Sequence, residues 1–273
     1  MQTLLVPVDF SPASRNALAY AAELARTLEA KLVLFHAYML PTPVSEVPYI
    51  MVTADEMQKE NEVMMAKDAA FVKEAYGLDC QTVVRLGIAS DETKVLQQEI
   101  QADLVVMGMK GAGGLEKIIG STTTNVIRKL KVPVLIIPHD AAFAAPRSIV
   151  YSSDFSYHKS FHLFDSLLQI ARYFQSVIHI LHIHLHHTGD HGDREMGKKD
   201  IENLFNGITH DYVDVESISV TQGVNDYLAK NPAQMLVMVA HKHSFFERIF
   251  SKNHTAAMAY ETHIPLLVLQ DKG

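Results

Sequence analysis

The succession of apolar and polar segments in this chain runs through once and then starts again, and this duplication constrains the fold more than any other feature. Asp9-Phe10-Ser11 follows the first apolar run, and Asp154-Phe155-Ser156 follows the run that opens the second pass. Val132-Pro133-Val134-Leu135 precedes the last run of the first pass, and Ile264-Pro265-Leu266-Leu267 holds the same place in the second. The chain therefore consists of two copies of one unit.

Each copy alternates short apolar runs with segments of helical period. Short apolar runs between turn residues are typical of strands, and an apolar stripe every three to four residues is typical of helices. Their alternation favours a parallel sheet with helices packed on it. The expected strands are 3–8, 31–39, 81–86, 103–108 and 133–138, then 148–156, 176–183, 214–220, 234–240 and 264–270. The expected helices follow Ser11 and lie near 54–76, 89–100, 120–130, 158–174, 193–206, 223–230 and 254–262.

Length and composition narrow the class of protein. A chain of 273 residues has room for two domains, and we expect them at 1–142 and 147–273, with 139–147 as the link. The net charge of −7, without a basic cluster, argues against nucleic-acid binding. No apolar run approaches the roughly 18 residues of a membrane span. One cysteine, Cys80, and the absence of a visible export signal indicate a cytoplasmic protein.

A glycine-rich stretch after the fourth expected strand is the best candidate for a binding site. It includes Gly108, Gly111, Gly113 and Gly114, and Gly120-Ser121-Thr122-Thr123 then opens a helix. Backbone N–H groups at a helix N-terminus attract anions, and glycines let a phosphate approach them. Asp9 ends the first strand at the same edge of the sheet, where it can meet ribose hydroxyls. A glycine-rich turn between strand and helix is the simpler alternative, and neither the Walker nor the dinucleotide pattern is present.

Three segments resemble a known family. VPVDFSPASRNALAYAAELA, LVLFHAY and LVVMGMKGAGGLEKIIGSTTTNVIRKLKVPVLIIP are similar to universal stress proteins, and the duplicated layout resembles their tandem class. The resemblance implies an α/β fold with two Rossmann-like domains of the adenine nucleotide α-hydrolase-like type. Each would hold a five-stranded parallel sheet of order 3-2-1-4-5 with helices on both faces. The family motif is Gly-x2-Gly-x9-Gly-Ser/Thr, whereas this chain has Gly108-x2-Gly111-x8-Gly120-Ser121, one residue shorter.

The resemblance also implies a role for each matching residue. It assigns Pro7 and Val8 to the adenine pocket, Ala37 to the base, Asp9 to the ribose, Gly108 to the ribose and first phosphate, and Gly111, Gly120, Ser121 and Thr123 to the phosphates. Members bind ATP or related adenine nucleotides, often with a divalent cation such as Mg²⁺, although some bind none. They dimerise through their last strands, so 133–138 and 265–270 would pair within this chain.

The second copy has lost the glycines. Aligned without gaps on Pro133 and Pro265, Gly108 corresponds to Ala240 and Gly113 and Gly114 correspond to Phe245 and Phe246. We interpret the C-terminal site as lost. The run HILHIHLHHTGDH (179–191) would place His182, His184 and His186 on one strand face, beside His187 and His191 in the following loop, as in a zinc or copper cluster. Solvent-facing or core histidines are the favoured interpretation, a pH response is a further alternative, and no metal ligand is assigned.

These observations predict a regulatory stress-response protein that binds ATP, ADP or AMP at one working site in its N-terminal half. The expected partners are the nucleotide and a second copy or an unknown protein, and neither nucleic acid nor membrane. An interaction scaffold without ligand and a slow ATPase are the alternatives. No catalytic residue is assigned, because PVDFSPAS lacks the His-x-Gly-His and Ser-Gly-Gly-x-Asp-Ser signatures of adenylyl-transferring relatives.

Overall fold

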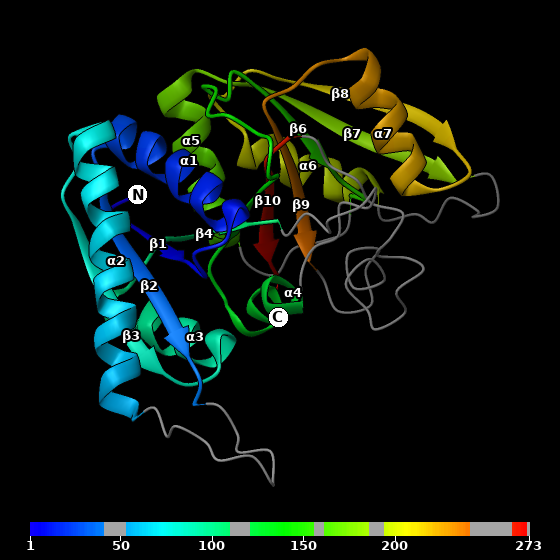
Figure 1. The fold of residues 1–273 in the computed structure, drawn as a ribbon. Coiled ribbons are helices and arrows are strands. Elements are labelled where there is room, and N and C mark those ends of the chain that lie inside the picture. Colours follow the sequence, from blue (N-terminus) through cyan, green and yellow to red (C-terminus); the bar gives the residue numbers. More distant parts are fainter. Residues whose placement is uncertain (41–52, 110–120, 156–160, 186–193, 241–263, 272–273) are drawn as a thin grey trace, which may run out of the picture.

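The fold is described from a computed structural model, shown in Figure 1. It describes residues 1–40, 53–109, 121–155, 161–185, 194–240 and 264–271. The first half holds β1 (Thr3–Pro7), α1 (Pro12–Leu28), β2 (Lys31–Tyr38), α2 (Ala54–Tyr76), β3 (Cys80–Leu86), α3 (Ala89–Ile100), β4 (Leu104–Gly108), α4 (Ser121–Lys129) and β5 (Val134–Ile137). The second half holds β6 (Ser148–Ser152), the 3₁₀ helix η1 (Phe161–Phe164), α5 (Asp165–Phe174), β7 (Val177–Leu185), α6 (Arg194–Leu204), β8 (His210–Ser217), α7 (Val220–Lys230), β9 (Met235–Ala240) and β10 (Leu266–Gln270).

The ten strands of the described residues form one sheet in the order β3-β2-β1-β4-β5-β10-β9-β6-β7-β8. Each half therefore has the predicted order 3-2-1-4-5, with parallel pairing throughout. The halves meet where β5 and β10 pair antiparallel, with Leu267 opposite Leu135. The predicted pairing of the two last strands is confirmed. The resemblance assigns the free edge of β5 to dimerisation between chains. In this chain β10 already pairs with that edge.

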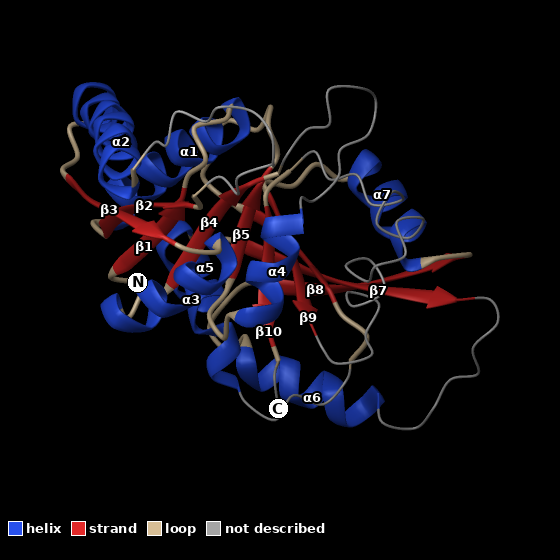
Figure 2. Cartoon of the chain, turned by 60° about the horizontal axis from the view of Figure 1, so that its bottom comes forward, coloured by secondary structure: helices blue, strands red, loops and turns tan. Residues whose placement is uncertain are grey.

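Helices cover both faces of this sheet, as predicted (Figure 2). Alternate strand residues point to opposite faces, so each face presents its own apolar set. Side chains of α1, α2, α5 and α6 pack with one set, which includes Leu4, Leu34 and Ile178. Side chains of α3, α4 and α7 pack with the other, which includes Leu5, Val33 and Leu181. None of the helices in the described part of the chain is long and apolar enough to cross a bilayer.

The link between the halves is packed against helices of both. The Asn16 side-chain amide donates to the carbonyl oxygens of Pro138 (2.8 Å) and Ala141 (3.0 Å). The ring of Phe143 lies 5.1 Å from Tyr20 of α1 and 6.4 Å from Phe174 of α5. These contacts satisfy backbone acceptors and place an aromatic side chain between α1 and α5, which lie on the same face of the sheet. The link is therefore a structured part of the molecule.

Several element boundaries differ from the prediction. The strand expected at 148–156 ends at Ser152, and the helix expected at 223–230 begins at Val220. The third strand of the second half was expected at 214–220, but β8 runs over His210–Ser217 because it pairs along the whole length of β7. Ser219 is the N-cap of α7, since its side chain accepts from the N–H of Gln222 at 3.2 Å. The helix expected at 158–174 begins, in the described part, as η1 at Phe161. The helix expected at 254–262 lies outside the described residues.

Candidate functional site

A cavity of about 170 Å³ lies at the carboxyl edge of the first half. It lies between the neighbouring strands β1 and β4, and the helices that follow them, α1 and α4, pack on opposite faces of the sheet. Open α/β sheets bind ligands at this position. Its lining includes Pro7, Val8, Asp9, Ala37, Gly108, Ser121 and Thr123. Seven of the nine site residues expected from the sequence thus share one cavity. Gly111 and Gly120 lie outside the described residues.

Asp9 leaves β1 through a turn that fixes its carboxylate at the cavity. Its Oδ1 accepts from the N–H of Ser11 at 3.0 Å, and its own N–H donates to Ser14 Oγ at 3.3 Å. Ser11 is also the N-cap of α1, accepting from the N–H of Ser14 at 3.2 Å. The cap of α1 and the placement of the carboxylate are therefore one network. A carboxylate has lone pairs for further donors, such as two ribose hydroxyls.

A ring pair behind Asp9 holds this turn, and the sequence analysis did not find it. Phe10 has a φ of 62°, a left-handed conformation that is strained for an aromatic residue. Its ring lies 4.4 Å from that of His36, whose Nδ1–H donates to the carbonyl of Val8 at 2.8 Å. In the second half, Phe155 (φ 57°), His182 and the Ser153 carbonyl repeat the arrangement. The recurrence of Asp-Phe-Ser, with a histidine in each second strand, was its sequence signal.

The opposite end of the cavity is the N-terminus of α4. Ser121, Thr122 and Thr123 all line the cavity, and Thr123 is only 4% exposed. The first-turn N–H groups of a helix lack intrahelical partners and carry partial positive charge. The first turn of α4 contains no acidic side chain to compete with an anion. The arrangement suits a phosphate, which these N–H and hydroxyl groups can bind without a basic side chain.

Gly108 has a packing role that the sequence analysis did not assign to it. A Cβ added there would lie 2.4 Å from the carbonyl oxygen of Ala13 and 3.1 Å from the nitrogen of Ser14. Both are backbone atoms of the first turn of α1, so neither can move aside on its own. Glycine at this position lets α1 approach the end of β4. The walls of the cavity around Asp9 depend on that approach.

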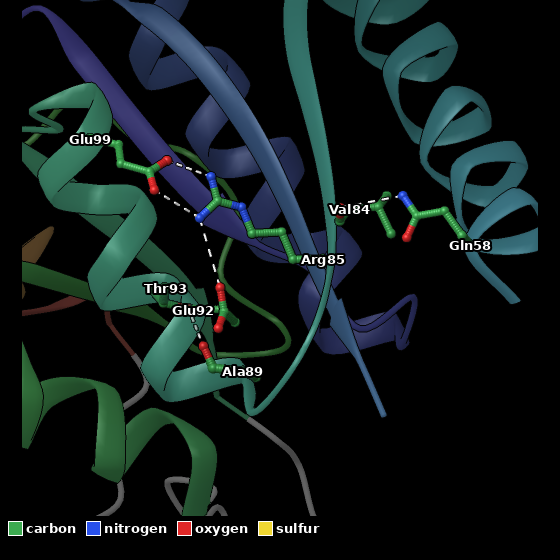
Figure 3. Close-up of polar contacts among 7 residues, drawn as sticks. All are labelled: Gln58, Val84, Arg85, Ala89, Glu92, Thr93 and Glu99. Atoms are coloured by element: carbon green, nitrogen blue, oxygen red, sulfur yellow. Dashed lines mark hydrogen bonds and ion pairs between the residues drawn. The ribbon is translucent and has the colours of Figure 1, made fainter. Parts of the chain in front are cut away.

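Two ion-pair groups dock α3, which brings Ala89 to the cavity. In the first group, Arg85 of β3 binds both carboxylate oxygens of Glu99 and lies 3.7 Å from Glu92 (Figure 3). The hydrogen bond from Arg85 lowers the pKa of Glu99. At the far side, Lys129 of α4 donates to Asp91 at 2.6 Å and to Ser90 at 3.0 Å. These pairs connect β3, α3 and α4, so they position two walls of the cavity.

In the second half, larger side chains stand at the two positions that hold Ala37 and Gly108 in the first. The N–H of Val8 donates to the carbonyl of Phe35, and the N–H of Ser153 donates to the carbonyl of Leu181 in the same way. Ile183, two residues after Leu181, is therefore the counterpart of Ala37. Ile183 is buried, and its Cδ1 lies 2.8 Å from where a Cβ of Gly223 would be, so α7 closes directly onto it. Ile137 and Leu269 are matching residues of the two last strands, because each lies four residues after the shared proline. Gly108 pairs with Ile137 and Val239 pairs with Leu269, so Val239 is the counterpart of Gly108.

The expectation that Ala240 replaces Gly108 was therefore wrong by one residue. The reason is that the second half has one residue more than the first between its fourth and fifth strands. Its positions 243–253, where the other replacements were expected, lie outside the described residues. Ile183, which is buried and packed against α7, nevertheless fills space that Ala37 leaves open in the first half.

Comparisons with known proteins agree with this architecture. The profile described as the universal stress protein family matches residues 1–138. A universal stress protein of Synechocystis sp. is 29% identical over 138 residues, covering 50% of this chain and 85% of the relative. One of Methanocaldococcus jannaschii is 27% identical over 142 residues, covering 49% and 80%. The crystal structure of a universal stress protein from Archaeoglobus fulgidus superposes with a TM-score of 0.77 at 19% identity over 98% of both chains, which shows the shared fold.

Proposed function

Because this chain belongs to the universal stress protein family, we propose that its N-terminal half binds an adenine nucleotide (ATP, ADP or AMP) and that the protein acts as a regulatory stress-response protein in the cytoplasm. One observation carries the proposal. A carboxylate at the end of β1 and a hydroxyl-rich helix N-terminus on α4 lie at two sides of one cavity. A nucleoside phosphate has the complementary chemistry, with diol donors at one end and anionic acceptors at the other.

The lining suggests how the nucleotide lies. Pro7, Val8 and Ala37 offer an apolar surface for the base, which a larger side chain at Ala37 would block. Asp9 accepts hydrogen bonds from the ribose hydroxyls, and the phosphates lie at the N-terminus of α4. Asp9 is the one carboxylate among the described lining residues. A Mg²⁺ ion would therefore depend mainly on phosphate oxygens and water, as is common for this ion.

Binding without rapid turnover is the form of activity that the cavity favours. Asp9 is the one ionisable side chain among the described residues that line it, and we assign it to the ribose end. No described lining residue is therefore placed to act as a general base at the phosphates. We expect any hydrolysis to be far slower than the roughly 10 per second of ordinary enzymes. The scaffold alternative predicts a protein that purifies without nucleotide and binds none.

The test is calorimetry with ATP, ADP and AMP, with and without Mg²⁺, on the whole chain and two matched variants. Asp9→Asn should weaken binding by tenfold or more, since a neutral amide accepts the ribose hydroxyls less well. Asp154→Asn changes the duplicated carboxylate of the second half and should leave the affinity unchanged. Binding of none of the three nucleotides would refute the proposal, as would equal losses in both variants.

A further inference from the structure

The second half gathers two histidines and an aspartate that the nucleotide proposal does not use. His182 and His184 are alternate residues of β7, so they share one face of the strand, and β8 pairs Asp214 directly with His182. One potential ligand atom from each residue lies within 4.8 Å of the others. The two imidazole rings are 4.7 Å apart and nearly perpendicular, at 86°. Nitrogen and carboxylate donors of this kind suit a divalent transition-metal ion.

A hydrogen bond to the backbone fixes the tautomer of His182. Its side chain is 8% exposed, and its Nδ1 lies 2.8 Å from the carbonyl oxygen of Ser153. A carbonyl only accepts hydrogen bonds, so Nδ1 carries the proton and Nε2 has the lone pair. Metal-binding histidines are commonly oriented by such a bond from their other nitrogen. Stacking at 4.9 Å and 25° on Phe155 fixes the plane of the ring.

The other two residues leave the cluster accessible from solvent. His184 Nε2 and Asp214 Oδ1 are 2.7 Å apart, and both side chains are partly exposed. Bonds of 2.0–2.1 Å to a tetrahedral ion place ligand atoms about 3.3 Å apart. The His184 and Asp214 atoms are already that near each other, and an ion would replace their hydrogen bond. The His182 atom, which lies within 4.8 Å of the other two, would have to approach them to complete the site.

The first half provides an internal comparison. His36 makes the same backbone bond as His182, to the carbonyl of Val8, but Tyr38 stands in the place of His184. Val84 pairs with His36 as Asp214 pairs with His182. The structural role of the buried histidine therefore needs neither of the other two groups. The first half has neither ligand at the matching positions, and in the second half Ile183 fills the position of Ala37.

We propose that His182 Nε2, His184 and Asp214 bind a divalent transition-metal ion of the Zn²⁺ type, with a fourth position left to water. Among the described residues, Lys198 carries a charge that opposes the cation. The ammonium of Lys198 lies 5.1 Å from the centre of the Phe155 ring and 5.8 Å from that of Tyr212, and its charge acts on Asp214. Removing that charge should therefore strengthen metal binding.

The experiment uses the full chain and Co²⁺, a spectroscopic substitute for Zn²⁺, with equilibrium dialysis of Zn²⁺ in parallel. We expect one Co²⁺ per chain with the visible spectrum of tetrahedral coordination. His184→Ala and Asp214→Asn should each weaken binding by tenfold or more and abolish that spectrum. Lys198→Gln should bind more tightly than the unmodified chain.

The matched controls are His179→Ala and Asp211→Asn, which alter a histidine–aspartate pair at 2.9 Å on the same two strands without a second histidine. They should retain both the affinity and the spectrum. Because the chain has fifteen histidines, a loss in the controls equal to that in the cluster variants would show adventitious binding and overturn the proposal. So would an absence of Co²⁺ and Zn²⁺ binding by the unmodified chain.

Discussion

At the residue scale, Gly108 determines how closely α1 approaches β4. Gly108→Ala puts a methyl group 2.4 Å from the Ala13 carbonyl oxygen, and relieving such overpacking costs about 1–3 kcal/mol of unfolding free energy. Because the shift moves a wall of the cavity, ATP affinity should fall as well. Urea unfolding and calorimetry on the same variant measure the two effects.

Gly77→Ala is the control for that experiment. Gly77 has a φ of +67° at the end of α2 and no neighbour within 4 Å of an added Cβ. Its replacement should cost about 1 kcal/mol through backbone strain and leave ATP affinity unchanged. A Gly108→Ala protein as stable and as strongly binding as the unmodified chain would contradict the packing account.

Most residues of the candidate site could be predicted from sequence because they sit at strand ends or at a helix start. Asp9 and Gly108 end neighbouring strands, and Ser121 opens a helix, so their shared edge follows from topology alone. The Phe10–His36 pair was missed because its signal, the repeated Asp-Phe-Ser with a histidine in each second strand, does not show that the two rings are in contact. Arg85 was missed because its partners, Glu92 and Glu99, come together with it only when α3 packs on the sheet.

At the scale of elements, the docking of α3 can be tested through Arg85. Arg85→Ala removes the contacts with Glu99 and Glu92, all on side chains that are at least a quarter exposed. We expect a loss of at most about 1 kcal/mol in unfolding free energy and a threefold to tenfold weaker ATP affinity, because Ala89 moves with the helix. Thermal unfolding and calorimetry provide the two values.

The control is Arg26→Ala, which breaks an exposed pair with Glu23 within α1. It should have a similarly small effect on stability and none on ATP binding. Equal ATP affinities in the two variants would show that α3 does not depend on Arg85 for its position at the cavity.

The type of an element could be predicted where one hydrophobic period, that of a helix or of a strand, dominates its sequence. Its boundaries could not be predicted where tertiary contacts decide them. The segment 214–220 alternates like a strand to its end, yet Ser219 caps α7 while β8 begins earlier to pair with β7. The sequence pattern shows that a strand is present. The length of its neighbour in the sheet sets where it starts.

At the scale of the whole molecule, we propose that 1–142 and 147–273 are two domains that share a sheet through β5 and β10. A fragment of residues 1–142 would leave the Val134–Ile137 edge unpaired, and exposed edges recruit further strands. We expect this fragment to form a dimer through β5, as two halves do here, while the full chain does not use this edge. Light scattering on both proteins tests the expectation, and a monomeric fragment would contradict it.

The central claim is that one half has room for a nucleotide and the other has filled that room. The most direct measurement is the number of ATP molecules bound per chain, by native mass spectrometry, before and after Ala37→Ile, which copies Ile183 into the first half. The account predicts one ATP per chain in the unmodified protein and none in a variant that stays folded. Two ATP molecules per chain, or one that persists in Ala37→Ile, would contradict it.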